Sequence, residues 1–485
     1  MTEARIPFGV GQRSGLERLA GGAPAAFNMV VDAAGAVRRR PCIEAYDEAP
    51  AGAVDADGVA GLYATSGGAL YAVGGATTSG RSVYRVVNGV AASVSQASKA
   101  ASFVRGYERP VFAETDALLV VAHGLLPPRK LVLKTEEVSA LAGAPVCSHV
   151  IAHGSRLSAN HTLDEYPGRI SYSGTAFASD VFTGHEQWGQ GVGNAGFYTA
   201  EARPDPVVAL HEASSEVFAF GTRTTQVFVQ DAGRVYSPLP TFEHGCIAPY
   251  SVTRRDQVFA WLDDKRRFIA SDGREHSVLS EAIQQDLDNM AVVADCFGYR
   301  VHHGPVDAFV WTFPTDGRTF VLQKGGGWSQ WASWDDASNN WAPLGILCHH
   351  QRADTGENLV GTTDGKVGKL TTSAQTDLGT RVPCHAVSGF LDRGTPRTKD
   401  CNRLRLVLQR GQQSTDSQLL VRWRDDLGEW NPPRVFDLGL LGDSRPDVAL
   451  SSLGTYRRRE WRFDFSGTED LVLVEAIEDF EVLED

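Results

Sequence analysis

Two pairs of adjacent histidines are the first candidates for chemistry in this sequence, at His302–His303 and His349–His350. Imidazole is the commonest protein ligand of transition metals. Each pair lies in a run typical of a β-strand, where neighbouring side chains point to opposite faces. Neither pair can therefore hold one ion by itself, and no carboxylate or thiol stands beside them at zinc-ligand spacing. We expect structural or surface roles for these histidines, with no metal and no cofactor.

Paired carboxylates suggest a second chemistry, glycoside hydrolysis, which needs two of them on either side of the scissile bond. The pairs are Asp263–Asp264, Asp335–Asp336 and Asp425–Asp426. A propeller glycosidase that acts on host surface polysaccharide is therefore one alternative, although Asp-rich turns are far commoner in β proteins than catalytic pairs. The sequence contains no GxSxG, HExxH or GxxxxGK[ST] motif. We predict that the protein is not an enzyme.

Tryptophans gather in one short stretch, at Trp328, Trp331, Trp334 and Trp341. Indole rings stack on sugars, so a sugar-binding propeller is a further alternative. Tryptophan is also a usual anchor of protein interfaces and of β-sheet cores. We interpret Trp328, Trp331 and Trp334 as possible interface residues.

Two runs of arginine are the remaining polar candidates, Arg38, Arg39 and Arg40 near the start and Arg457, Arg458 and Arg459 near the end. Three basic residues at the end of a strand usually form a solvated face or pair with a neighbouring subunit. The second run lies beside acidic strands. We expect both runs to take part in contacts between subunits.

Short alternating runs closed by Gly or Asp are the elements that must position these residues. They are clearest between Val207 and Asp272, in VFAF, TQVFVQ, QVFAWL and RRFIAS. Such runs are typical of antiparallel strands joined by tight turns. Similar sets recur about every 40 residues from residue 58 onward. The pattern predicts an all-β protein with a β-propeller of about six or seven blades, the seventh set being incomplete.

Three regions follow from this pattern. Residues 1–50 form an N-terminal arm, 51–378 the β-propeller, and 379–485 a C-terminal antiparallel β-sandwich with longer alternating strands. One helix is expected in SVLSEAIQQDLDNM, with Ser277 or Ser280 as its N-cap. It would place Ile283, Leu287 and Met290 on one face.

Composition limits the partners. The net charge of −13 opposes sequence-specific binding to nucleic acid, which requires clustered basic residues. The same charge suits a surface along which DNA slides, although solubility explains it equally well. Seven scattered cysteines without a CxxC pair indicate buried reduced thiols. The sequence has neither a membrane-length apolar run nor a secretory signal, so we expect a cytosolic product with no membrane insertion.

Several segments together resemble the packaged-DNA stabilisation proteins of short-tailed bacteriophages, which are head-to-tail connector components also called tail accessory factors, tail hub or nozzle proteins. The segments are NMVVDAAGAVRRRP, GSRLSANHTLDEYPGRISYSG, VFAFGTRTTQVFVQ, HGCIAPYSV and the C-terminal sandwich. The stretch from Phe218 to Ala248 carries the resemblance best, with its Gly221–Thr225 turn and its Gly-x-Ile-Ala step at Gly245.

The resemblance implies a structural virion protein of the phage tail, assembled in the host cytoplasm. Copies of it would form a sixfold ring, a hexamer, below the portal and adaptor ring proteins. The ring would conduct and seal the packaged DNA, with double-stranded DNA passing non-specifically through its lumen. It would also hold a needle or plug protein and dock tail fibre or spike proteins.

Overall fold

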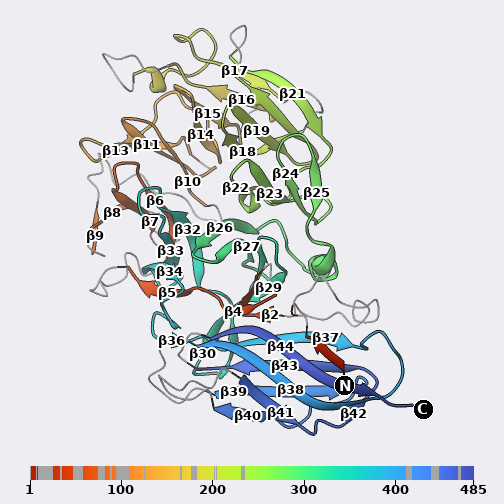
Figure 1. The fold of residues 1–485 in the computed structure, drawn as a ribbon. Coiled ribbons are helices and arrows are strands. Elements are labelled where there is room, and N and C mark those ends of the chain that lie inside the picture. Colours follow the sequence, from red (N-terminus) through yellow and green to blue (C-terminus); the bar gives the residue numbers. More distant parts are fainter. Residues whose placement is uncertain are drawn as a thin grey trace.

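The computed structural model of the chain describes residues 2–6, 8, 26–32, 35–46, 58–74, 82–87, 90–93, 109–124, 126–163, 166–175, 183–200, 203, 205–230, 235–410, 418–437, 447–467 and 471–484. These residues form antiparallel β-sheets joined by turns, which confirms the predicted all-β class. Figure 1 shows a propeller above a layered pair of sheets, and both chain ends lie at the sheets. In blades 1 to 6 the four strands pair in chain order, as alternating sequences closed by turn residues predict.

Seven sets of four strands make the propeller, and each set is one blade. Blade 1 is β6 (Val59–Ala64), β7 (Leu70–Gly74), β8 (Ser82–Val87) and β9 (Val90–Ser93); blade 2 is β10 (Val111–Glu114), β11 (Leu118–Ala122), β12 (Arg129–Val132) and β13 (Glu137–Ala140); blade 3 is β14 (Val150–His153), β15 (Arg156–Asn160), β16 (Arg169–Tyr172) and β17 (Gly196–Thr199). Blade 4 is β18 (Val207–Ala213), β19 (Glu216–Gly221), β20 (Thr225–Val229) and β21 (Ser237–Phe242); blade 5 is β22 (Thr253–Arg255), β23 (Val258–Leu262), β24 (Phe268–Ser271) and β25 (His276–Val278). Blade 6 is β26 (Phe297–His303), β27 (Val306–Phe313), β28 (Arg318–Gln323) and β29 (Trp328–Trp331); blade 7 is β32 (Ile346–Gln351), β33 (Asn358–Thr362), β34 (Val367–Thr371) and, from the N-terminal segment, β5 (Cys42–Ala45).

A hydrophobic cluster fills each of the seven spaces between adjacent blades, so the ring is closed. Between blades 7 and 1, Cys348 and Leu359 pack with Val59 and Leu62. The predicted incomplete seventh blade obtains its fourth strand from the other end of the sequence, because β5 pairs antiparallel with β34. The propeller is therefore closed by a strand that lies before blade 1 in the chain.

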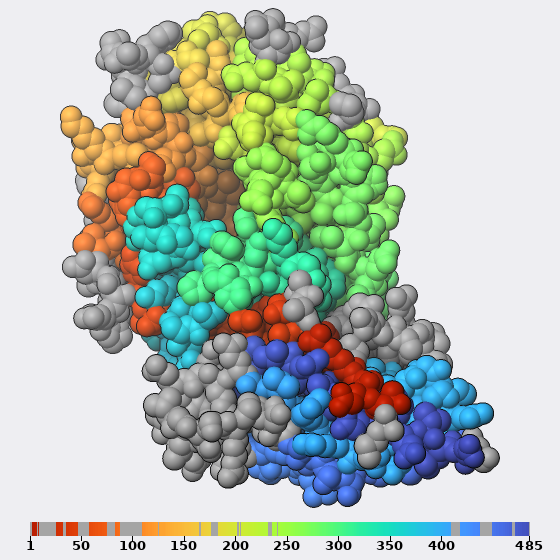
Figure 2. Space-filling view, in the orientation of Figure 1, coloured from red at the N-terminus to blue at the C-terminus, as the bar shows by residue number. Residues whose placement is uncertain are grey.

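The remaining strands form two sheets that share one core, as predicted for the C-terminal sandwich. One sheet contains β1 (Thr2–Arg5), β3 (Met29–Val31), β4 (Val37–Arg39), β38 (Lys399–Arg410), β41 (Asp447–Ser451), β42 (Thr455–Tyr456) and β44 (Leu471–Val482). The other contains β2 (Ala26–Phe27), β37 (Cys384–Leu391), β39 (Gln418–Asp425), β40 (Arg434–Asp437) and β43 (Arg459–Phe465), and it continues into blade 6 because β2 also pairs with β29. The N-terminal segment is thus built into both parts. Figure 2 shows its orange-red residues between the propeller and the blue sandwich, and its deeper red residues over the sandwich.

Two short hairpins flank blade 7 in the chain. β30 (Ser333–Asp335) pairs with β31 (Asn340–Ala342) before blade 7, and β35 (Thr376–Asp377) pairs with β36 (Thr380–Arg381) after it.

The predicted helix is shorter than expected, and its N-cap is partly wrong. It consists of a 3-10 turn, η4 (Glu281–Ile283), followed by α2 (Gln284–Asp288). Ser277 belongs to β25, while the Ser280 hydroxyl accepts a hydrogen bond from the Phe268 amide at 3.1 Å and so ties the segment to β24. The apolar face is as predicted, since Ile283, Leu287 and Met290 are buried between blades 5 and 6. Among the described residues, no helix is long and apolar enough to span a bilayer.

Candidate functional site

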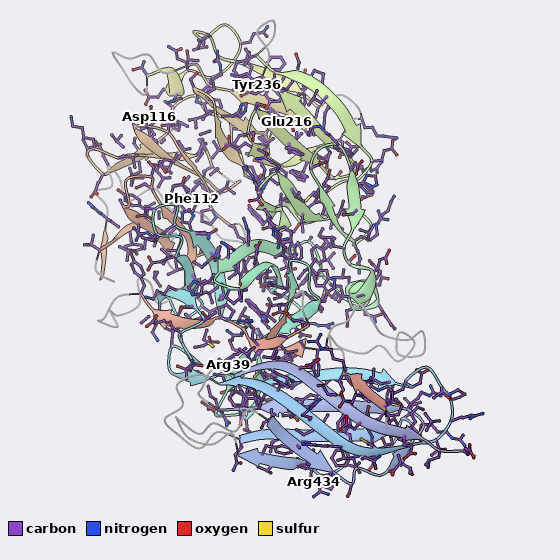
Figure 3. All side chains as sticks on the ribbon, viewed as in Figure 1. Arg39, Phe112, Asp116, Glu216, Tyr236 and Arg434 are labelled. Atoms are coloured by element: carbon purple, nitrogen blue, oxygen red, sulfur yellow. The ribbon has the colours of Figure 1, made fainter. Side chains whose placement is uncertain are left out.

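The arginine run at the start of the chain lies inside the molecule. Arg40 is 1% exposed, and its guanidinium pairs with the Asp377 carboxylate and donates to Asn28 Oδ1 at 3.1 Å. Arg39 is also buried; it donates to the Gln375 backbone carbonyl at 3.1 Å and stacks over Phe465. Figure 3 places Arg39 where the propeller meets the sandwich. The predicted subunit contact is therefore wrong for Arg39 and Arg40, which join parts of one chain.

Arg38, whose side chain is 22% exposed, lies 3.6 Å from the Asp32 carboxylate.

The tryptophans are also mostly internal. Trp328 and Trp331 are buried in the cores on either side of blade 6, and the Trp328 indole nitrogen donates to the Leu279 carbonyl at 3.0 Å. Neither ring can stack on a sugar or a partner, so their interpretation as interface residues is wrong. Trp334 is half-buried and meets Trp341 edge-on, with ring centres 5.0 Å apart, while Arg381 lies over its face at 5.1 Å.

The second arginine run divides at the start of β43, because Arg457 and Arg458 lie in the bend before this strand and Arg459 is its first residue. Arg459 has no exposed surface; it holds the Asp425 carboxylate with two hydrogen bonds of 2.7 and 2.9 Å, under the rings of Tyr456, Trp423 and Trp461. Its predicted contact with another subunit is therefore replaced by an internal ion pair. Arg457 and Arg458 are exposed.

The aspartate pairs serve turns and ion pairs. Asp263 is buried and accepts two hydrogen bonds from the Arg267 guanidinium, while Asp264 accepts one from the Gly245 amide. Asp426 accepts a hydrogen bond from the Arg458 amide at 2.9 Å.

In the exposed hairpin of β30 and β31, Asp335 accepts a hydrogen bond from the Ala337 amide at 3.0 Å and Asp336 pairs with Arg381 at 2.7 Å.

Histidines gather near the propeller axis, where the first strands of the blades meet. His349 stacks on Tyr299 with ring centres 4.8 Å apart, and His149 stacks on Tyr250 at 5.3 Å. Burial lowers the pKa of His149 and His349 to about 3, and that of His211 and His350 to about 4. These rings are neutral packing groups at pH 7. The described residues contain no group of three metal-ligating side chains.

The carboxylate of Asp205 holds the Gly221–Thr225 turn, which is part of the stretch that resembles the phage proteins. The Asp205 carboxylate accepts hydrogen bonds from the backbone amides of Thr222, Arg223 and Thr224, each at 2.8 Å, and from both threonine hydroxyls. Burial alone would raise the pKa of Asp205, but these hydrogen bonds hold it below its ordinary value. The sequence did not reveal the role of Asp205, because this residue lies before blade 4, 17 residues from Thr222.

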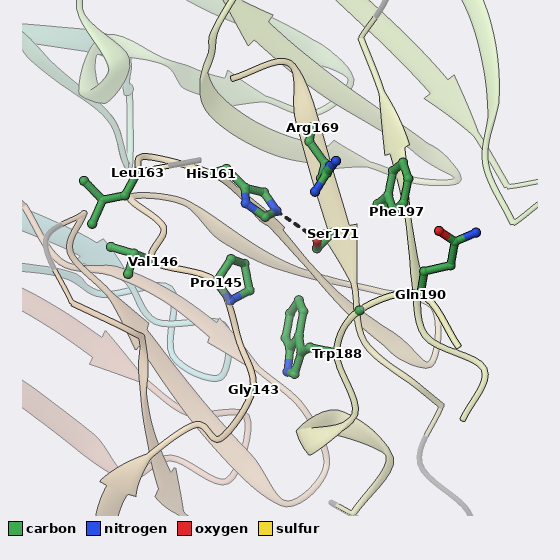
Figure 4. Close-up of a pocket in the computed structure, with 11 residues that line it drawn as sticks. Gly143, Pro145, Val146, His161, Leu163, Arg169, Ser171, Trp188, Gln190 and Phe197 are labelled. Carbon is green, nitrogen blue, oxygen red and sulfur yellow. Dashed lines mark hydrogen bonds between the residues drawn. The ribbon is translucent and has the colours of Figure 1, made fainter. Parts of the chain in front are cut away.

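A pocket of about 720 Å³ between blades 2 and 3 is a further candidate site (Figure 4). Strand register brings its polar groups together. Ser171 pairs with Phe197 on the neighbouring strand, and Arg169 stands two residues from Ser171, so the three share one face of blade 3. His161 follows β15 and lies with its Nε2 2.8 Å from the Ser171 hydroxyl.

Aromatic groups complete this pocket. The Trp188 ring lines it from the loop between β16 and β17, held by a hydrogen bond of 2.7 Å from its indole nitrogen to the His185 carbonyl. The Arg169 guanidinium lies between the rings of Tyr166 and Phe197, 4.3 and 4.5 Å from their centres. The sequence showed the alternation of β16, but it could not show that β17, which begins 24 residues after the end of β16, would be its partner.

Comparison with known proteins gives one family match. Residues 191–315 match a family model described as "Bacteriophage P22 Gp10, beta-propeller". This range runs from just before β17 to just after β27, and it includes Asp205 and the turn that Asp205 holds. The match relates this part of the chain to a structural phage protein. No curated protein matches the chain.

Several solved structures match the chain at low similarity. The extracellular domain of a one-component system protein from B. thetaiotaomicron is 8% identical, with a TM-score of 0.44 over 84% of this chain and 47% of that one. The Neurospora crassa Pan2 WD40 domain is 7% identical, with a TM-score of 0.39 over 68% of this chain and 94% of that domain. BamB from Moraxella catarrhalis is 11% identical, with a TM-score of 0.36 over 68% and 99%. The chain thus spans about half the length of the first of these proteins.

Proposed function

We propose that this chain is a structural protein of a bacteriophage tail, in which copies of it form a closed ring below the portal and adaptor proteins. The observation that carries the proposal is the match of residues 191–315 to the phage propeller family, which falls on blades whose strands the structure describes. The resemblance of further segments outside this range, NMVVDAAGAVRRRP above all, supports the same role.

The geometry supports a rigid spacer. The propeller has seven packed blade cores, and one sheet of the sandwich continues into blade 6. The propeller and the sandwich should therefore bend little relative to each other. The buried pair of Arg40 with Asp377 fixes the same junction. A ring of such subunits would enclose a lumen of constant width, and the net charge of −13 would keep DNA phosphates from adhering to its wall. Fibre, spike, needle and adaptor proteins would dock on the outer loops.

Imaging tests the ring. The purified chain is mixed with the adaptor ring of the same phage and examined by electron microscopy and by sedimentation. We expect closed rings that contain six copies of the chain. A chain that stays monomeric at every adaptor concentration would contradict the proposal.

Charge reversal locates the contact. Arg457→Glu with Arg458→Glu changes an exposed pair at the sandwich, and we expect it to weaken ring formation. Arg274→Glu is the matched control, since this side chain is exposed on blade 5. Equal assembly of both variants would exclude the arginine run from the interface.

A further inference from the structure

We propose that Leu427 is an apolar anchor in a contact between copies of this chain, where it acts together with three exposed arginines. The inference rests on the proposed ring and names the surface with which one copy would hold the next. This surface, which we call the sandwich tip, consists of Arg397, Leu427, Arg457 and Arg458.

Leu427 has an unusual backbone conformation. The turn after β39 consists of Asp425, Asp426, Leu427 and Gly428, and a hydrogen bond of 2.8 Å from the Gly428 amide to the Asp425 carbonyl closes it. Both central residues have positive φ angles, 51° at Asp426 and 68° at Leu427, which is the pattern of a type I′ turn. Glycine, asparagine and aspartate tolerate this conformation, whereas a bulky residue such as leucine is strained in it. The turn therefore holds a residue that its backbone disfavours.

Packing within the chain does not offset this strain. Leu378 is the other described leucine with a positive φ angle, of 49°, and its side chain packs against the core between blades 6 and 7. The Leu427 side chain is 68% exposed, and it belongs to none of the core clusters that the described residues form. Strained backbone positions concentrate at functional sites. An exposed leucine in a strained turn therefore indicates a partner that covers it.

A buried lysine ties two loops of the sandwich tip together. Lys399 has no exposed surface, and its ammonium group donates to the backbone carbonyls of Thr395, Arg397 and Arg457 at 2.8, 2.8 and 2.7 Å. These three hydrogen bonds use all three donors of the ammonium. The backbones of Arg397 and Arg457 are therefore fixed next to each other.

Asp426 joins the turn of Leu427 to the same loops. Its carboxylate accepts hydrogen bonds from the Arg457 and Arg458 amides at 3.4 and 2.9 Å, and its own amide donates to the Arg458 carbonyl at 2.9 Å. Figure 1 shows β42, which directly precedes these arginines, at the end of the sandwich where the C-terminus lies. A surface whose loops are already fixed loses little conformational entropy when a partner binds.

The charges of the sandwich tip suit a protein partner. Arg397, Arg457 and Arg458 are exposed, and their guanidinium groups form no ion pair with any residue of the described ranges. Carboxylates of a partner would give them charge-assisted hydrogen bonds. Asp392 and Glu429 are exposed in the same loops, so the tip carries both signs of charge and suits a protein better than a nucleic acid. A second copy of the chain, with its net charge of −13, offers the carboxylates.

The test compares Leu427→Gly and Leu427→Asn with the parent chain. Glycine and asparagine suit the turn better than leucine, so the melting temperature should stay the same or rise. Sedimentation measures association of the chain alone and with the adaptor ring of the same phage. We expect both variants to need at least about ten times more protein than the parent for half-maximal association, because they lose the burial of an apolar side chain.

Two control variants should associate as the parent does. Val435→Thr changes another exposed apolar side chain of the sandwich, on β40, where no strained turn is involved. Ser214→Gly places glycine at another exposed turn residue with a positive φ angle, of 54°, between β18 and β19.

A photoreactive group identifies the partner. The residue p-benzoylphenylalanine replaces Leu427, and the associated particles are irradiated and analysed by mass spectrometry. We expect products that join two copies of the chain. Products that join the chain only to the adaptor would overturn the choice of a second copy.

The outcomes separate this contact from the ring itself. Rings that form equally well from the parent and from Leu427→Gly would overturn the contact and leave the ring role standing. A parent chain that stays monomeric in every mixture would overturn both. Weaker association of Leu427→Gly together with a lower melting temperature would also overturn the contact, because the leucine would then serve the fold. An equal loss in Val435→Thr would do the same, since the effect would not be specific to Leu427.

Discussion

Arg40 and Asp377 are 337 residues apart in the sequence, yet their side chains form a buried ion pair beneath the propeller. The Asp377 carboxylate also accepts a hydrogen bond of 2.9 Å from the Ile43 amide, at the start of the strand that completes blade 7. One carboxylate thus holds both the arginine and the closing strand.

Removing this carboxylate should destabilise the whole propeller. We expect Asp377→Ala to lower the free energy of unfolding by about 3–5 kcal/mol, because it leaves a buried guanidinium without its charge partner. Urea unfolding followed by tryptophan fluorescence measures the change. Glu243→Ala is the control, since the Arg203–Glu243 pair is exposed and its loss should cost less than about 1 kcal/mol. Equal losses of unfolding free energy in the two variants would show that the buried pair stabilises the protein no more than the exposed pair does.

The buried histidines should make stability fall in mild acid. The pKa values of His149 and His349 in the folded protein are about 3, below the ordinary 6.5, so the unfolded chain takes up protons first as the pH falls. Their contribution is complete above about pH 6.5 and is lost progressively below it, by up to about 1.4 kcal/mol per pH unit for each group. Melting temperatures between pH 7.5 and 4.5 test this.

His149→Gln should flatten that pH dependence, because the variant has one fewer buried group to protonate. Gln285→Asn, at an exposed position on α2, should leave it unchanged. A parent protein whose stability is constant from pH 7 to 5 would contradict the expectation.

Gly245 should tolerate no side chain. A Cβ atom there would collide with the backbone of Thr222 and Arg223, which cannot move without breaking the turn held by Asp205. We expect Gly245→Ala to cost at least about 1–3 kcal/mol, the range for overpacking. Gly67→Ala is the control, since its Cβ would have its nearest neighbour at 3.9 Å. Thermal unfolding of both variants gives the comparison.

Asp205 should matter for the same turn. Asp205→Asn replaces an acceptor of five hydrogen bonds with a group that is half donor, and we expect a loss of about 2–3 kcal/mol in unfolding free energy at pH 7. Because the pKa of Asp205 is lowered on folding, its stabilisation is present above the ordinary pKa of a carboxyl and is lost as the pH falls below it. The difference between parent and variant should therefore shrink in strong acid, which acid unfolding curves measure.

Local patterns were enough to predict most of the propeller. The strands of blades 1 to 6 appear as alternating runs, and their partners are neighbours in the sequence. The fourth strand of blade 7 could not be predicted in this way, because Cys42–Ala45 pairs with a strand more than 300 residues later. The C-terminal sandwich was predicted from its own alternation, but the strands that the N-terminus adds to it were not.

Side-chain roles were harder to predict, because burial depends on partners that the sequence does not reveal. Arg40 and Arg459 look like solvated cations in a local window, and both are buried with carboxylates from distant strands. Trp331 looks like a surface anchor until blade 7 is packed against it. The pocket at Arg169 depends on a pairing between β16 and β17 across a long loop. No local sequence motif predicted this pocket.

The strand that closes blade 7 has a consequence for the order of synthesis. A ribosome makes Cys42–Ala45 well before the strand near residue 370 that pairs with it, and it makes β1 well before its partner β44. These two early strands can therefore pair only late in synthesis. We expect an incomplete chain to have an unfinished propeller and an unfinished sandwich together, so that subunits whose translation stopped early are kept out of any assembly.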